Sequence, residues 1–431
     1  MKPLSPTSPS IALLALALGG PAAPALATDF SVSGFGTLGY ARSDRAYGYQ
    51  RFIDDRGTVQ RDSVAGLQVD ARFAEGFGAT VQVKAAARSD RDTGYEASIA
   101  WAFVSYRPDN DWLLRVGKQR IPLYLYSENY DVGASYDFAR LPTEMYSITP
   151  SNDFVGASFS RVWKGGGGEW TLEGYAGRSD TSFRYWLREG VPGFVGAGPV
   201  FGDLSVKGVG LLLTQKTDEH SLRVGIHRAH AAADTPFPAT YPFVELAPGF
   251  GYFQTDPALP GPGIAFNDKV VNTVLTFGAE WQFTPATRGV AEFARVVTKH
   301  DDLGPQGNRG HAAVLHRLGK WTPYIDYAFL RSPARQRTLY ARLDSIRLPD
   351  AVPGAALINA LQRAAADNLL VYDQHSWALG TSYALSLTSK VKAEFTVTRI
   401  GGVSALVNVP PGDSASRRRI NFFSVSYSAV F

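Results

Sequence analysis

The sequence of 431 residues contains no cysteine. This absence excludes disulfide frameworks, thiolate zinc sites, iron–sulfur clusters and cysteine nucleophiles. Methionine is scarce, and beyond the N-terminus there is no apolar run of the roughly 18 residues that a membrane-spanning helix needs. The 43 basic and 39 acidic residues are too balanced for an electrostatic nucleic-acid binder. Aromatic side chains, in contrast, make up 12% of the chain, and they favour β-strands.

The first 27 residues have the pattern of a secretory signal peptide. Lys2 supplies the positive charge, residues 11–18 form an apolar stretch too short to span a bilayer, and a small-x-small cleavage pattern ends at Ala27. A buried N-terminal helix is the alternative, but two prolines that follow the apolar stretch argue against its continuation. We therefore expect cleavage before Thr28 and a mature chain, residues 28–431, that folds as a single domain outside the cytoplasm.

Alternation of apolar and polar residues dominates the mature chain, although it is blurred at 205–215 and 287–299. Val391, Ala393 and Phe395, for example, alternate with lysine, glutamate and threonine. Side chains that alternate at period two lie on opposite faces of a strand, and each segment has about the length of a tilted transmembrane strand. The alternation predicts sixteen strands, at 30–41, 61–73, 77–88, 95–106, 112–119, 152–163, 169–178, 205–215, 220–230, 270–284, 287–299, 310–317, 320–331, 374–385, 389–400 and 420–431.

The links between these segments alternate in length. From the second segment onward every other link is short, whereas the links between them are mostly long, notably 120–151, 179–204, 231–269 and 332–373. Short periplasmic turns and long extracellular loops are typical of outer-membrane β-barrels. Aromatic residues flank the short turns, as in the interfacial girdle of such barrels: Phe73, Phe77, Tyr106, Trp112, Trp163, Trp170, Phe283 and Trp321.

The final segment alternates and ends on Phe431. An apolar strand with a C-terminal aromatic resembles the signal that the outer-membrane assembly machinery of Gram-negative bacteria reads, so we expect Phe431 to be an assembly signal. Residues 30–40 (FSVSGFGTLGY) look like the opening strand of proteobacterial porins. Residues 116–119 (VGKQ), which lead into a long loop, look like their fifth strand and third loop.

The resemblance to porins implies an all-β, transmembrane antiparallel barrel of sixteen strands around a water-filled pore, with the third loop folded inward. It also implies a homotrimer in the cell outer membrane, surrounded by lipid and lipopolysaccharide. The extra length of 231–269 and 332–373 leaves eighteen strands as an alternative.

Charged residues near the third loop are the candidate pore constriction. Loop 120–151 carries four carboxylates, and strand parity points basic side chains inward on the second, third and fifth segments. Facing rows of opposite charge would produce a transverse field that selects solutes by charge and dipole; solvated surface charges are the alternative. The acidic side is Glu128, Asp131, Asp137 and Glu144, and the basic side is Arg72, Lys84, Arg88, Arg115 and Arg120.

The two longest loops show different patterns. Loop 231–269 contains seven prolines, which predicts a stiff extracellular cap rather than a pair of strands. Residues 351–368 show the apolar spacing of a short amphipathic helix above the pore mouth. A packed loop without a gating role is the alternative.

Signatures of other chemistry are weak. Gly34, Gly36 and Gly39 match GxGxxG, but the match lies within a strand, where small residues instead suit close packing of protomers. His227 and His230 fall on opposite faces of a strand, so we expect no metal site, and no cofactor or hydrolase motif points to an enzyme. The expected function is passive diffusion of small hydrophilic solutes and ions. The alternatives are a channel selective for an anion, organic acid or sugar, and, further away, a surface receptor, an adhesin or a barrel-embedded enzyme.

Overall fold

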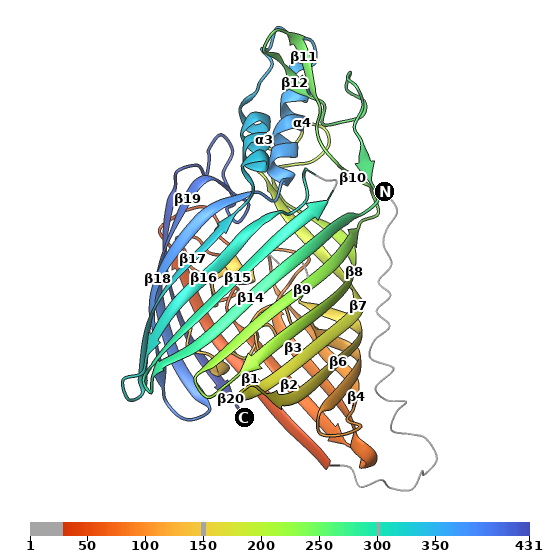
Figure 1. Ribbon diagram of the computed structural model, residues 1–431. Coiled ribbons are helices and arrows are strands. Elements are labelled where there is room, and N and C mark those ends of the chain that lie inside the picture. Colours follow the sequence, from red (N-terminus) through yellow and green to blue (C-terminus); the bar gives the residue numbers. More distant parts are fainter. Residues whose placement is uncertain (1–28, 148–151, 300–301) are drawn as a thin grey trace.

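The structure is a computed structural model that describes residues 29–147, 152–299 and 302–431. The expected signal peptide and the cleavage point between Ala27 and Thr28 lie outside the described residues. Sixteen antiparallel strands form a closed barrel (Figure 1). They are β1 (Asp29–Ser43), β2 (Val64–Arg72), β3 (Phe77–Ala87), β4 (Tyr95–Tyr106), β5 (Trp112–Arg120), β6 (Asp153–Gly165), β7 (Gly168–Leu187), β8 (Gly198–Lys216), β9 (His220–Ala232), β14 (Val270–Thr284), β15 (Thr287–Lys299), β16 (Gly307–His316), β17 (Trp321–Arg331), β18 (Tyr372–Ala384), β19 (Ser389–Ser404) and β20 (Arg419–Val430).

Each of the sixteen predicted segments is a strand of this barrel, which confirms the predicted fold. The largest difference is in the β7–β8 hairpin, which pairs continuously out to Leu187 and Gly198. A strand of about 9–11 residues crosses a membrane, so the outer part of this hairpin extends beyond the lipid.

The wall is apolar outside and polar inside. Val32, Leu38 and Val116 are exposed on the outer surface, and the predicted aromatic residues beside the short turns, such as Trp321 and Phe283, are exposed as well. Thr398 and Ser428, in contrast, are buried on the inner surface. Apolar side chains therefore lie outside and polar side chains inside, the reverse of a water-soluble protein, as expected for a wall that faces lipid. In the described part of the chain, no helix combines the length and the apolar character needed to cross a bilayer.

The barrel closes where β1 pairs with β20. Gly34 and Phe431 exchange two backbone hydrogen bonds of 3.0 Å, and the phenyl ring of Phe431 lies over the glycine. A Cβ atom at position 34 would lie only 2.2 Å from that ring. The missing side chain of the glycine thus leaves room for the terminal aromatic ring at the barrel seam.

The two longest loops form a cap above the barrel rim (Figure 1). The loop after β9 holds two short strand pairs, β10 (Phe237–Pro238) with β13 (Phe266–Asn267) and β11 (Phe243–Ala247) with β12 (Phe250–Phe253). The prediction that this loop contains no strand pair is therefore wrong. The chain reverses between β11 and β12 at Gly249, whose φ of +73° suits a tight turn even in a proline-rich loop. The alternative of eighteen barrel strands is also wrong, since these pairs lie outside the barrel sheet.

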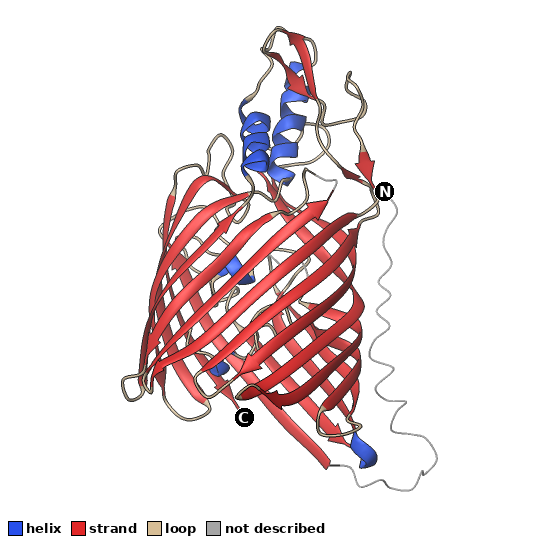
Figure 2. Ribbon diagram, viewed as in Figure 1, coloured by secondary structure: helices blue, strands red, loops and turns tan. Residues whose placement is uncertain are grey.

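The loop after β17 contains two helices, α3 (Ala334–Ser345) and α4 (Ala355–Asn368), shown in blue above the barrel in Figure 2. The second confirms the helix predicted over 351–368. The first was not predicted, although its run of Ala, Arg, Gln and Leu is rich in strong helix formers. Leu343 of α3 and Ala366 of α4 pack with Tyr241 and Phe253 in a buried apolar cluster, so the two loops form one unit.

Barrel closure generates a matched pair of variants. Gly34→Val places a side chain against the Phe431 ring, whereas Gly36→Val, two residues along the same strand, meets only the Val64 carbonyl oxygen at 3.9 Å. We expect the first variant to lose about 1–3 kcal/mol of stability through overpacking and the second to lose much less. The temperature at which the folded, fast-migrating band disappears from an unboiled denaturing gel measures the difference. Equal losses would show that the ring contact does not matter for closure.

Candidate functional site

The described part of the third loop, residues 121–147, folds into the barrel, as the sequence predicts. Its two short helical segments, η2 (Gly133–Ser135) and α2 (Thr143–Tyr146), are visible inside the wall in Figure 2. An apolar face of the loop packs against the inner surface of β15, β16 and β17 in one buried cluster. Phe138 lies at the centre of this cluster, 5.1 Å from the ring of Tyr324. Apolar burial therefore holds the loop on one wall.

Polar groups strengthen the same attachment. Asp137 accepts hydrogen bonds from Arg288 at 2.9 Å, from Ser382 at 2.9 Å and from Lys390 at 2.8 Å. Burial raises the pKa of Asp137, but the hydrogen bonds and charges of Lys390, Ser382 and Arg288 together outweigh burial, so the pKa is lowered from its ordinary value. Nearby, Lys392 donates to the carbonyl oxygen of Gly133 at 2.7 Å. Four side chains from three strands of one wall thus bind a single segment of the loop.

The opposite edge of the loop contacts the other wall. Lys84 of β3 lies 2.9 Å from Asp131, and Arg120 at the end of β5 forms an ion pair with the same carboxylate. Arg115 of β5 lies 3.6 Å from Glu128. In the closed strand order β3 and β15 are eight places apart among sixteen, so they face one another across the barrel. The loop therefore crosses the lumen from wall to wall.

Five of the nine predicted charged residues lie together here. They are Lys84, Arg115, Arg120, Glu128 and Asp131, and we call them the constriction cluster. The expectation was that the two signs would face one another across water; instead they form direct ion pairs. Asp137 instead binds Arg288 of β15 and Lys390 of β19, on the wall opposite the constriction cluster. The alternation of residues along these two strands predicts that both basic side chains point inward.

Arg72, Arg88 and Glu144 lie elsewhere. Arg72 ends β2 beside a short turn, where it is exposed, and Arg88 forms an ion pair of 2.7 Å with Asp90 in the β3–β4 loop. Glu144 is only 2% exposed and accepts a hydrogen bond of 2.8 Å from Gln374. Burial raises the pKa of Glu144, which disfavours its charged form. These three residues do not meet the constriction cluster, because parity and loop membership specify a face but not a height in the barrel.

A cavity of about 500 Å³ lies between the third loop and the cap. Ser147 of the third loop and Gln50 of the β1–β2 loop line one side, and Tyr241 and Leu369 line the cap side. Three arginines also line the cavity, Arg51, Arg184 and Arg309, whereas none of its described lining residues is acidic. Arg51 and Arg184 share one carboxylate, that of Asp92, at 2.9 and 2.5 Å. Sequence reasoning missed this cavity because its residues come from loops and strand ends far apart in the chain.

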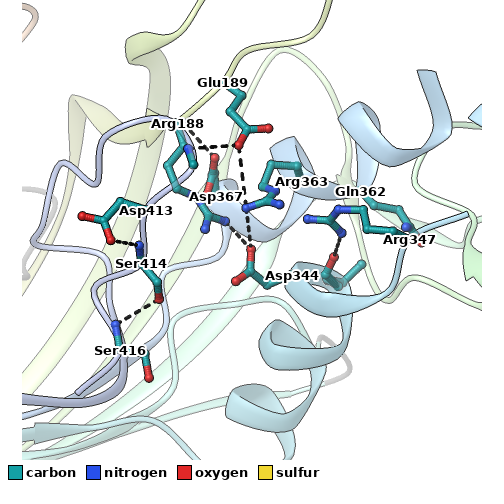
Figure 3. Close-up of polar contacts among 12 residues, drawn as sticks. Arg188, Glu189, Asp344, Arg347, Gln362, Arg363, Asp367, Asp413, Ser414 and Ser416 are labelled. Atoms are coloured by element: carbon teal, nitrogen blue, oxygen red, sulfur yellow. Dashed lines mark hydrogen bonds and ion pairs between the residues drawn. The ribbon is translucent and has the colours of Figure 1, made fainter. Parts of the chain in front are cut away.

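Ion pairs fix the cap above the cavity (Figure 3). Arg188, just after β7, lies 2.6 Å from Asp344 of α3 and 2.6 Å from Asp367 of α4. Arg363 adds a contact of 3.4 Å to Asp344. The Arg188 guanidinium is buried, and a buried cation that contacts two carboxylates is strongly held in place. The cap helices are therefore attached to the β7–β8 hairpin.

Known structures share this architecture. An outer membrane protein of Vibrio cholerae, OmpT with its loop L8 deleted, matches with a TM-score of 0.51 and 11% identity over 94% of this chain and 100% of its own. An anion-selective porin from Comamonas acidovorans matches with a TM-score of 0.50 and 12% identity over the same shares. OprB of Pseudomonas putida matches with a TM-score of 0.50 and 8% identity over 94% of both chains. No protein-family model and no curated protein matches the sequence.

Similarity at this level of identity shows the fold. The chain has the fold of the outer-membrane porins, and its closed sheet and apolar outer surface make it a membrane-embedded barrel of the outer-membrane class.

The attachment of the third loop generates the second prediction. Asp137→Asn removes a carboxylate that three wall residues bind, and we expect the loop to lose about 1–3 kcal/mol of local stability. Amide hydrogen exchange over residues 121–147 should then speed up. Because the pKa of Asp137 is lowered on folding, the wild-type attachment is present at neutral pH and should weaken only as pH falls below the ordinary range of aspartate.

Asp180→Asn is the control for this variant, since the Arg178–Asp180 pair is 65% exposed at both side chains and such pairs contribute little. Unchanged exchange in Asp137→Asn, or an equal effect in the control, would show that these bonds do not hold the loop.

Proposed function

We propose that this protein is an outer-membrane porin that forms a water-filled channel for passive diffusion of small hydrophilic solutes and ions. The observation that carries the proposal is the third loop, which crosses the lumen of a closed barrel and presents charged side chains there. Such a loop narrows the path, so its charges decide which ions pass. The proposal assigns no catalytic activity to the chain.

Within the constriction cluster, Arg115 and Glu128 are the residues that a permeating ion would meet. Their side chains are 33% and 49% exposed, whereas Arg120 and Asp131 are nearly buried and paired with one another. A paired, buried charge has little net field, but a half-exposed pair 3.6 Å apart stays accessible to water and ions. We therefore assign ion preference chiefly to Arg115 and Glu128.

The surroundings of the channel are proposed on the resemblance to porins and on the strand pattern. Residues 1–27 would be removed on export, the outer-membrane assembly machinery would read Phe431, and the mature barrel would assemble as a homotrimer in lipid and lipopolysaccharide. The 79% exposure of Phe431 on the outer surface leaves its ring accessible to such machinery.

Single-channel recording in planar bilayers tests the proposal. Stepwise conductance is expected from the purified full chain. In a tenfold KCl gradient, Arg115→Gln should shift the reversal potential toward cation preference and Glu128→Gln toward anion preference. Both shifts should shrink in concentrated salt, since the screening length falls from about 10 Å at 0.1 M to about 3 Å at 1 M.

Arg56→Gln serves as the control, because this arginine is 86% exposed in the β1–β2 loop and lies outside the constriction cluster. It should leave the reversal potential unchanged. Absence of stepwise conductance from folded protein would refute the channel, and wild-type reversal potentials in both constriction variants would refute the assignment of ion preference.

A further inference from the structure

We propose that the cavity between the third loop and the cap is a binding site for a small carboxylate that carries an apolar body. The inference rests on the proposed channel function, because a site at this position lies on the path from the extracellular side to the constriction cluster. It deepens that function by naming a substrate class.

Arg309 carries the inference. This residue of β16 lies on the inner surface, lines the cavity and is 9% exposed. Its Nη1 atom is buried and has no hydrogen-bond partner, and its guanidinium forms no ion pair with any carboxylate of the described residues. A buried cation without a counter-charge is costly. An anionic ligand would supply the missing partner, and guanidinium and carboxylate groups match in a bidentate geometry.

The rest of the wall adds positive charge. Arg51 and Arg184 share the single carboxylate of Asp92, so these three side chains carry one net positive charge. With Arg309, the net charge around the cavity is two positive, and none of the described lining residues offsets it. Each arginine of the pair is already held by Asp92, so Arg309 is the group that is free to bind an anion.

Apolar side chains define what the anion must carry. Phe183, Phe237, Tyr241, Leu330, Leu369 and Tyr372 line the same cavity. A hydrated inorganic ion gains nothing from such walls, whereas an aromatic or aliphatic acid buries apolar surface against them. The volume of about 500 Å³ lies within the range of small-molecule sites, about 300–1,000 Å³.

The roof of the cavity is held in position, which favours binding. Asn368 and Leu369 of the roof directly follow Asp367, the carboxylate that Arg188 binds at 2.6 Å (Figure 3). On the opposite side Ser147 lines the cavity, and it belongs to the third loop, which is attached to both walls of the barrel. A preformed cavity costs a ligand less ordering than a mobile one.

Calorimetric titration of the detergent-solubilised full chain tests the site with three probes: benzoate, its neutral isostere benzamide, and inorganic phosphate. Benzoate should bind, and each of the other two should bind at least tenfold more weakly, since one lacks the charge and the other lacks the apolar body. Arg309→Gln should weaken benzoate binding at least tenfold, and Arg309→Lys, which keeps the charge but not the fork, should weaken it less. Arg178→Gln, at an exposed pair outside the cavity, should bind benzoate as the wild type does.

Several results would overturn the proposal. Wild-type affinity of Arg309→Gln for benzoate, or equal affinity for benzamide, would remove Arg309 as the anion-binding group. Phosphate that binds as tightly as benzoate would remove the role of the apolar wall. Gel mobility of unboiled samples shows whether each variant is folded, and Arg309→Lys remains informative should Arg309→Gln fail to fold.

The failure of the site and the failure of the channel are distinguishable in planar bilayers. Conductance without benzoate binding would refute the site and leave the channel. Benzoate binding without conductance would refute the channel and leave the site. With both present, benzoate added on the extracellular side should interrupt the wild-type current more often than the current of Arg309→Gln.

Discussion

Every backbone polar group of a strand in lipid must find a partner within the protein, because hydrocarbon offers none. This constraint governs the whole structure. It requires β1 to pair with β20, and the pairing brings the first strand and the last residue of the chain together at Gly34 and Phe431. The two hydrogen bonds between these residues extend the backbone pairing of β1 with β20. The glycine lies against the terminal ring, which occupies the space that a side chain would fill. Of the three glycines that match a phosphate-binding motif, Gly34 is the one that lies against the terminal ring at the barrel seam.

The same constraint, applied inside the barrel, explains the third loop. A loop within the lumen brings its own polar groups into a confined space, so each must be satisfied by the wall. Asp137 meets its partners on β15, β18 and β19, while Asp131 meets Lys84 and Arg120 on the opposite side. Apolar packing around Phe138 decides which wall the loop lies against. Attachment on both sides makes the constriction a fixed feature of the barrel.

Much of this fold could be predicted because its signals are local. Period-two alternation specifies a strand and its two faces, and alternating loop lengths specify which ends face which side of the membrane. The site depends on relations that are not local. Parity placed Lys84 and Arg88 on one face of one strand, but only the height of the third loop decides that Lys84 binds Asp131 while Arg88 binds Asp90. Glu144 looked like its neighbouring carboxylates, yet its place on the packed side of α2 buries it. The partners of Asp137 come from strands more than 150 residues further along the chain, and no pattern within the loop points to them.

Charged side chains form two groups along the lumen, the constriction cluster and the lining of the cavity above it. The two groups differ in how many of their cations are paired with a carboxylate. In the constriction cluster each cation has a carboxylate of the loop or of the following strand as its partner. In the cavity above, two of the three arginines share one carboxylate, the third has none among the described residues, and apolar side chains occupy the remaining wall. In the proposed channel, a solute that enters from outside would meet an anion-attracting, partly apolar chamber before it meets a nearly neutral, hydrated gap. An anion concentrated in the chamber is not repelled by a strong opposing field at the gap, since the paired charges there largely cancel. In this arrangement the chamber would select by chemistry, whereas the constriction would act by size and through the half-exposed pair of Arg115 and Glu128.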